Sequence, residues 1–233
     1  MAATLGDTRG DTRGETRARH IVVGAGGQGR VVLETWRAMD PSAELLIVDD
    51  AAHLHGSEVG GAKVVGAVEQ LATLGGDVIL ALGDNRTRLA LAATWTARGV
   101  AWGTAIHPSA FISPTATIGG GTVVLPGAIV HTGARIGAHA IINSGVIVEH
   151  DCVLEDGVSV SPGVCMAGRV TLGRGAFVSV GATIAPRLRI GAGTVIGAGA
   201  VVVSDLPAGV LAVGVPARVV RDNLDGFDFK RLL

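Results

Sequence analysis

The sequence predicts a parallel β-helix preceded by a small α/β domain. Two observations carry this prediction. Residues 111–206 divide into sixteen consecutive hexads, and the second position of every hexad is aliphatic or Met. Residues 20–98 instead alternate short apolar strands with helical stretches, which is typical of a small parallel sheet. Hexapeptide repeats are a signature of β-helices, so the longer part of the chain is expected to be a solenoid.

Composition agrees with this division. The 233 residues leave room for one or two domains, and 48% are hydrophobic although only 3% are aromatic. Thin coils packed with Val, Ile and Ala leave little space for rings. The net charge of −1 gives no electrostatic case for binding nucleic acid or a membrane surface. The chain lacks both the roughly 18 consecutive apolar residues of a membrane helix and a charged-then-apolar leader, so we expect a cytoplasmic protein.

Residues 1–18 carry the tandem sequences GDTR, GDTR and GETR, which are polar and charge-balanced. We expect them to form a disordered extension. The α/β domain is predicted over residues 19–105 and to resemble a Rossmann fold. Its expected strands cover residues 20–24, 45–48 and 78–82, and its expected helices cover residues 30–39 and 87–98.

A glycine-rich loop follows the first strand of this domain. Residues 24–29 read GAGGQG, which matches the dinucleotide pattern G-x-G-x-x-G, and Asp49 lies about twenty residues further on. A complete dinucleotide fold needs two βαβαβ halves, however, and only about 85 residues precede the β-helix. A half-fold can still hold one nucleotide, with phosphate at the helix N-terminus and ribose or base at the strand-end carboxylates. The alternative is that the glycines only make a tight turn.

The β-helix is predicted over residues 106–220, and residues 221–233 form a tail. Three hexads would make one triangular coil, with the aliphatic second position pointing inward and stacking on its copies above and below. The fifth position is most often Gly, which suits corners that need unusual backbone angles. Cys152 and Cys165 occupy packing positions and are expected to be free thiols.

Three histidines of the repeat could do chemistry. His131 and His139 have no adjacent acid, so we interpret them as surface or corner residues. His150 differs because it lies in the run Glu149-His150-Asp151. An imidazole can accept a proton from an amine or a hydroxyl when a carboxylate holds its other ring nitrogen. Asp151, with Glu149 as the second choice, is expected to supply that carboxylate. A corner histidine exposed to water is the alternative.

Several motifs resemble one family. GAGGQG, IVDD, ALGDN, AIHPSA, INSGVIVEHDC, SPGV, MAGRV and VGVPAR look like the sialic-acid O-acetyltransferase-like sugar acyltransferases, and they occur in the same order. That group includes the UDP-4-amino-sugar and GDP-perosamine N-acetyltransferases. The resemblance covers about residues 20–220 and implies a left-handed β-helix. It also implies transfer of acetyl from acetyl-CoA to the amino group of a nucleotide-linked amino-dideoxy sugar, such as UDP-4-amino-4,6-dideoxy-GlcNAc.

The resemblance further implies a role for each matching residue. His150 would be the general base, Asp151 would orient it, Asn143 would help to place the sugar or the imidazole, and the Gly168 N–H would donate to the oxyanion. The protein would be a homotrimer with acetyl-CoA in the groove between neighbouring β-helices. The cofactor would contact Val180, Gly181, Ala198, Gly199, Val215 and Pro216. The nucleotide would contact Gly26, Gly27, Gln28, Asp49, Asp50, Gly83 and Asn85.

Two residues depart from the family pattern. Gln28 replaces a histidine that is common in the glycine loop, and it can still donate a hydrogen bond. Ser159 stands where the family often has a second histidine that contacts acetyl-CoA. We expect that Ser159 takes over this contact, or that the thioester is held differently.

Two other functions remain open at this point, and a third is disfavoured. An O-acetyltransferase of sialic acid or a related sugar could use the same base. A non-catalytic, trimeric nucleotide-binding protein would have the same fold. A metal-dependent enzyme of the carbonic-anhydrase-like type needs three convergent histidines, which the repeat does not offer. We therefore expect no metal.

Overall fold

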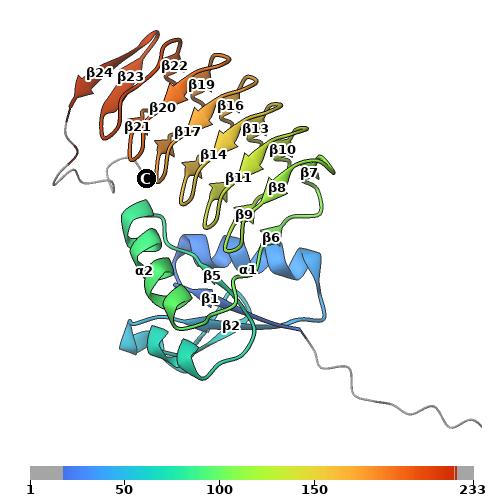
Figure 1. The fold of residues 1–233 in the computed structure, drawn as a ribbon. Helices are drawn as coiled ribbons and strands as arrows, with labels where there is room; N and C mark the ends of the chain where they lie inside the picture. Colours follow the sequence, from blue (N-terminus) through green and yellow to red (C-terminus); the bar gives the residue numbers. More distant parts are fainter. Residues whose placement is uncertain (1–17, 223, 225–233) are drawn as a thin grey trace, which may run out of the picture.

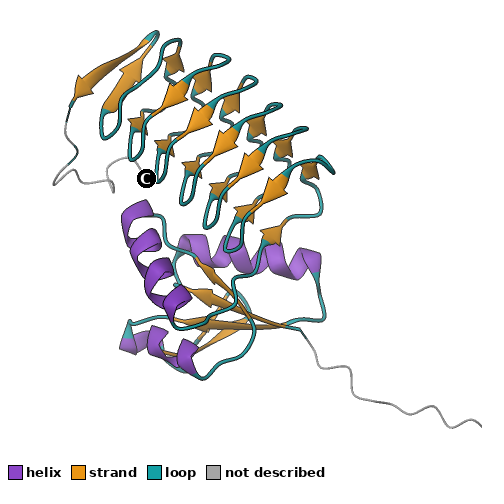
Figure 2. Ribbon diagram, viewed as in Figure 1, coloured by secondary structure: helices purple, strands orange, loops and turns teal. Residues whose placement is uncertain are grey.

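The computed structural model describes residues 18–222 and 224 and contains two parts (Figure 1). An α/β domain carries the helices, and a β-helix of short strands stands on top of it (Figure 2). Within these residues, no helix combines the length and the apolar character needed to cross a membrane. The predicted extension over residues 1–18 lies almost wholly outside the described residues, as does most of the predicted tail.

The α/β domain has a five-stranded sheet with the order β3-β4-β2-β1-β5, in which only β3 is antiparallel to its neighbour. The predicted strands and helices are present within a few residues of their expected ends. The β3–β4 pair was not predicted, because β3 has only two residues and is separated from β4 only by Gly60-Gly61. The elements are β1 (Arg19–Val23), α1 (Gly27–Met39), β2 (Glu44–Val48), η1 (Ala52–Leu54), β3 (Glu58–Val59), β4 (Ala62–Gly66), η2 (Val68–Ala72), β5 (Asp77–Leu80) and α2 (Asn85–Ala97).

Each face of this sheet is covered by one helix. Along β1, Val22 packs in the cluster that contains α1, whereas Ile21 and Val23 pack in the cluster that contains α2. This alternation follows from the two-residue period of a strand. The α1 cluster also includes Val123 from the first coil of the β-helix, and Trp36 of α1 donates a hydrogen bond to Thr104 O at 3.1 Å. The β-helix is thus built directly onto α1.

The β-helix has three sheets, and each of the sixteen hexads contributes one two-residue strand. The first sheet contains β6 (Ala105–Ile106), β9 (Val123–Val124), β12 (Ile141–Ile142), β15 (Ser159–Val160), β18 (Phe177–Val178), β21 (Val195–Ile196), β23 (Leu211–Gly214) and β24 (Ala217–Arg221). The second contains β7 (Phe111–Ile112), β10 (Ile129–Val130), β13 (Ile147–Val148), β16 (Cys165–Met166), β19 (Thr183–Ile184) and β22 (Val201–Val202). The third contains β8 (Thr117–Ile118), β11 (Arg135–Ile136), β14 (Val153–Leu154), β17 (Thr171–Leu172) and β20 (Arg189–Ile190).

The register between strands confirms the predicted β-helix. Ile147 pairs with Cys165 and Val148 with Met166, so corresponding residues of successive coils are 18 positions apart. The second-position side chains stack into one continuous core, in which Val148 and Met166 are fully buried. Corner glycines such as Gly145 have positive φ, as expected. Cys152 and Cys165 are free thiols, also as expected. The fold is a left-handed β-helix on a small Rossmann-like domain.

A buried arginine fixes α2 against the β-helix. The Arg88 side chain is fully buried, and burial lowers its pKa to about 10. The guanidinium therefore stays charged at neutral pH, and it is surrounded by acceptors from both domains. It donates to Leu82 O, Asn85 Oδ1, His139 O, Gly157 O and Ser159 Oγ at 2.6 to 3.0 Å.

We expect Arg88→Ala to lower the free energy of unfolding by about 3 kcal/mol, because it leaves several buried acceptors without a donor. Arg98→Ala is the matched control. Arg98 follows the same helix and pairs with Glu69 at 2.7 Å on the surface, so its loss should cost below about 1 kcal/mol. Chemical denaturation of both variants measures the difference. Equal losses would show that Arg88 is not the main contact between the domains.

Candidate active site

His150 lies at the corner between the second and third sheets, immediately after β13. Its Nδ1 lies 3.0 Å from Asp151 Oδ2, and the side chains of both residues are about half exposed. The backbone holds this corner from both sides: Asp151 N donates to Thr132 O on the preceding coil, and Arg169 N donates to His150 O from the following coil. The imidazole and its orienting carboxylate are thus carried by two rigid coils.

Gly168 is the residue one coil above His150. A Cβ on Gly168 would collide with His150 Nε2, so the imidazole lies across the space that the missing side chain leaves. The backbone of Gly168 does not have positive φ, so the imidazole, and not the backbone conformation, requires glycine here. Within residues 18–222 the Gly168 N–H donates no hydrogen bond. A proton acceptor and an unused N–H therefore lie side by side.

Asp151 is the carboxylate that orients the imidazole. Hydrogen bonding to His150 is the main cause that lowers the pKa of Asp151 below its ordinary value of 3.8, and Arg169 contributes. Asp151 therefore stays ionised and accepts the Nδ1 proton, which leaves Nε2 as the free acceptor. Glu149 does not orient the imidazole through Nδ1. Its Oε2 accepts the backbone N–H of His150 at 3.3 Å, and its Oε1 lies 3.7 Å from His131 Nε2.

The glycine loop borders an open groove of about 670 Å³ in the α/β domain. Gly26, Gly27, Gln28, Asp49 and Gly83, which the family resemblance assigns to the nucleotide, all line it. Its wall also includes residues that were not predicted, namely Gly24, Ala81, Leu82, Asp84 and Thr87.

The N-terminus of α1 in this groove is open. Gly26 caps the helix without a side-chain hydrogen bond, and a Cβ at Gly26 or Gly27 would meet nothing within 4 Å. The Gln28 Nε2 atom is buried and has no hydrogen-bond partner among the described residues. The N-terminus of α2, by contrast, is capped by Asp84, whose side chain accepts from Thr87 N. Unsatisfied helix N–H groups favour an anion, so the groove can hold phosphate beside α1.

Two residues predicted to contact the nucleotide serve the fold instead. Asp50 does not line the groove, and its carboxylate accepts from Val68 N at the start of η2. Asn85 is buried between the domains, where its Nδ2 donates to the carbonyls of Gly175 and Ala176. Asp49 does line the groove, although each carboxylate oxygen already accepts one backbone N–H.

The contact between the two domains also overturns the predictions for two other residues. Ser159 is only 4% exposed and its hydroxyl donates to Asn85 Oδ1 at 2.7 Å, so this chain does not present it to a cofactor. His139 is a corner residue but is not at the surface. It is 6% exposed and packs edge-on against Trp102, because the α/β domain covers that corner. Burial is the main cause that lowers the His139 pKa. Neither position could be assigned without the docking of the two domains.

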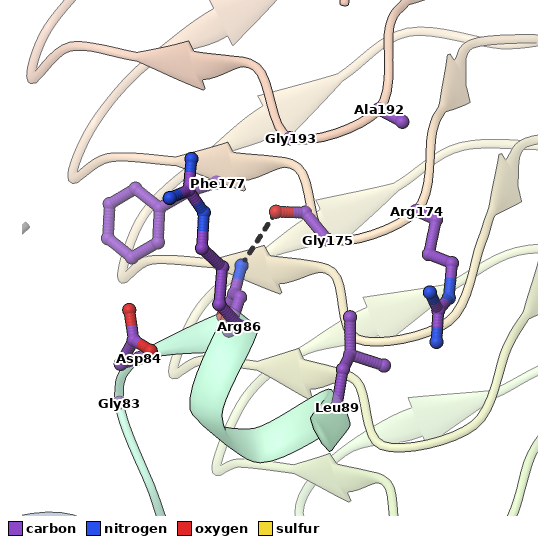
Figure 3. A pocket seen from close by; sticks show the side chains of 10 residues that line it. Gly83, Asp84, Arg86, Leu89, Arg174, Gly175, Phe177, Ala192 and Gly193 are labelled. Carbon is purple, nitrogen blue, oxygen red and sulfur yellow. Dashed lines mark hydrogen bonds between the residues drawn. The ribbon is translucent and has the colours of Figure 1, made fainter. Parts of the chain in front are cut away.

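A smaller cavity of about 200 Å³ lies beside the groove, between α2 and the β-helix. Figure 3 shows Arg86 reaching toward Phe177 on one side of it, with Arg174 on the other. The hydrogen bond from Asn85 to Gly175 closes one wall. Gly83 and Asp84 line both the groove and the cavity.

The predicted cofactor residues lie at another corner, between the first and second sheets. Val180 is 52% exposed, and its carbonyl accepts from Gly199 N one coil above. Val215, at the tip of the β23–β24 hairpin, is 74% exposed. Asn143 belongs to this corner too, since it follows β12, and no hydrogen bond joins it to His150 in the described part of the chain. Within one chain, these residues therefore lie at a different corner of the β-helix from His150, with the second sheet between the two corners.

Comparisons with known proteins connect this arrangement to an enzyme family. A model of the PglD N-terminal domain matches residues 19–94, whereas a comparison with curated proteins finds no match. Among solved structures, a histidine-to-asparagine variant of perosamine N-acetyltransferase from Caulobacter crescentus, in complex with CoA and GDP-perosamine, is 40% identical. The match covers 88% of this chain and 98% of that chain, with a TM-score of 0.82.

Two other solved structures match over similar lengths. The acetyltransferase domain of PglB from Neisseria gonorrhoeae, in complex with acetyl coenzyme A, is 35% identical with a TM-score of 0.84, and 88% of this chain covers all of it (100%). WeeI from Acinetobacter baumannii is 28% identical with a TM-score of 0.79, over 87% of this chain and 100% of that chain. The chain belongs to the acetyl-CoA-dependent sugar N-acetyltransferases with a hexapeptide-repeat β-helix.

In this sugar N-acetyltransferase, the contact between His150 and Gly168 can be tested directly. We expect Gly168→Ala to push the imidazole from its place while the β-helix stays folded, and to lower activity about 100-fold, the cost of misplacing a reacting group by about 1 Å. Activity and the circular dichroism spectrum are to be measured together. Gly75→Ala is the control, because the added methyl group meets open space. Full activity of Gly168→Ala would show that the imidazole position is irrelevant.

Proposed function

We propose that the protein transfers the acetyl group of acetyl-CoA to the amino group of a nucleotide-linked amino-dideoxy sugar, with His150 as the general base. The observation that carries the proposal is the contact of His150 Nδ1 with Asp151 Oδ2, together with the position of the imidazole against Gly168 of the next coil. The Caulobacter relative is named as bound to GDP-perosamine, which makes a GDP-linked amino sugar the first acceptor to test. UDP-4-amino-4,6-dideoxy-GlcNAc is the second.

The geometry supports direct attack within a ternary complex. The sugar amine attacks the thioester carbonyl, and Nε2 of His150 takes the proton that the amine loses. Asp151 holds the Nδ1 proton and stabilises the imidazolium that forms. The free N–H of Gly168 donates to the oxygen that becomes negative. Collapse of this intermediate releases CoA as a thiolate, which regains a proton from the imidazolium and returns the base to its starting state.

The groove of the α/β domain suits the nucleotide part of the acceptor. The open N-terminus of α1 places uncapped N–H groups where a diphosphate would lie, and Gln28 adds a donor that has no partner within the described chain. The carboxylates of Asp49 and Asp84 at the strand ends can accept hydrogen bonds from ribose or base. Gly26 and Gly27 leave room for phosphate to approach the backbone.

We further propose that the working enzyme is a homotrimer. The exposed corner with Val180, Gly181, Ala198 and Gly199 is separated from His150 in one chain, so a groove containing both requires a second copy. Acetyl-CoA would lie in that groove, with its thioester at His150 of one subunit and its pantetheine arm along the glycine-rich corner of the next. Val215 and Pro216 would contact the adenine.

We expect His150→Ala to lower kcat by roughly 100- to 10,000-fold, because the amine loses its proton acceptor. The measurement is release of CoA thiol with acetyl-CoA and four acceptors: UDP-4-amino-4,6-dideoxy-GlcNAc, GDP-perosamine, free sialic acid and CMP-sialic acid. His131→Ala, which removes a neighbouring histidine one coil below, is the control and should cost below about tenfold.

The acceptor panel separates the alternatives. CoA release with one amino sugar, lost in His150→Ala, supports N-acetylation and identifies the nucleotide. Release with sialic acid alone would replace this proposal by O-acetylation, because the same base can serve a hydroxyl. Normal turnover by His150→Ala would exclude His150 as the base. No turnover with any acceptor, by a folded trimer that binds a nucleotide sugar, would favour the non-catalytic alternative.

We expect Gln28→Ala to raise the KM for the nucleotide sugar about 10- to 100-fold with little change in kcat. Loss of one hydrogen bond to a charged phosphate costs about 1.5–3 kcal/mol, and this contact is remote from the reacting amine. Steady-state kinetics measure both constants. Gln70→Ala, outside the groove, is the control. An unchanged KM would remove Gln28 from the site.

A further inference from the structure

At the corner that carries His150, several residues other than glycine have positive φ, a conformation that is otherwise found mostly at glycines among the described residues. Starting from Gly133, the corresponding residues of successive coils are Asp151, Arg169 and Arg187, with φ of 68°, 59°, 64° and 64°. The corresponding column at the first–second corner contains only glycine: Gly127, Gly145, Gly163, Gly181 and Gly199. A side chain in this region costs about 1–2 kcal/mol, and such conformations often persist because the side chain has a function.

Arg169 contacts the carboxylate that orients the imidazole. Its Nε lies 3.6 Å from Asp151 Oδ2, the same oxygen that lies 3.0 Å from His150 Nδ1. The backbone links the two partners as well, since Arg169 N donates to His150 O at 2.9 Å. One carboxylate oxygen is therefore shared between an imidazole and a guanidinium from successive coils.

The charges around His150 are otherwise mostly negative. Asp151 and Glu149 lie on its own coil, Arg169 lies on the coil above, and His131 lies on the coil below beside Glu149. The Cys152 thiol turns inward and donates to Ala167 O. Among the described residues, Arg169 is the arginine that forms an ion pair with Asp151, so its charge partly offsets the negative charge of this corner.

We propose that Arg169 is a positioning residue that sets the basicity of His150 by sharing the Asp151 carboxylate with it. The guanidinium withdraws part of the negative charge from the imidazole and fixes Asp151 Oδ2 in line with Nδ1. A larger fraction of the base is then neutral at a given pH and ready to take the proton of the amine. This inference rests on the proposed role of His150.

The test replaces Arg169 by glycine, the residue that this backbone conformation favours, so the coil keeps its fold. Removing a positive charge several ångströms away in a water-like medium should move the acid limb of the kcat/KM profile up by about half a pH unit. Arg187→Gly is the matched control: it has the same φ, lies one coil further on, and forms no ion pair within residues 18–222. Arg169→Lys keeps the charge and should restore the profile.

NMR titration of the His150 ring in the unliganded protein provides a readout that needs no acceptor, with His150→Ala to identify its signal. The expected result is the same upward shift of the titration midpoint in Arg169→Gly and none in Arg187→Gly. Coincident titrations of Arg169→Gly and the parent, or equal shifts in both glycine variants, would overturn the proposal. If no acceptor turns over, the proposed function fails, but the NMR titration still decides the role of Arg169.

Discussion

The 18-residue register of the β-helix determines both the core and the corner that carries His150. Each inward aliphatic side chain stacks on its copy one coil away, and the same spacing places Gly168 above His150. A slip of one residue would turn the core side chains outward and set Ala167 or Arg169 against the imidazole. The position of His150 is therefore secured by the packing of the whole solenoid and not by local contacts alone. This explains how a half-exposed histidine can be held in one place.

The second determinant is the junction between the domains. Fully buried Arg88 draws together α2 and the corners at His139 and Gly157, while Asn85 and Ser159 complete the same hydrogen-bond network. This network fixes the groove beside the glycine loop relative to the β-helix. A rigid junction suits an enzyme that must hold a long acceptor at one end while its amine reacts at the other, because misplacing the reacting amine is costly.

The sequence alone predicts what periodicity controls. The β-helix and the corner glycines follow from counting residues, and the Asp151 contact follows from adjacency. Gly168 was singled out through the family resemblance. Contacts between the domains have no such period. The family resemblance therefore assigned Asn85 and Ser159 to ligand binding, His139 was interpreted as a surface or corner residue, and Arg88 carried no signal at all. The β3–β4 pair was missed because β3 has only two residues and neither strand shows an alternating apolar pattern.

The most direct test of the central claim is chemical rescue of His150→Gly by imidazole in the assay buffer. If His150 takes the proton of the amine, CoA release by this variant should be slow, should rise with the concentration of added imidazole, and should yield an N-acetylated sugar by NMR. CoA release by the control variant Arg187→Gly should not change when imidazole is added. Turnover of His150→Gly at the parent rate without imidazole would contradict the account.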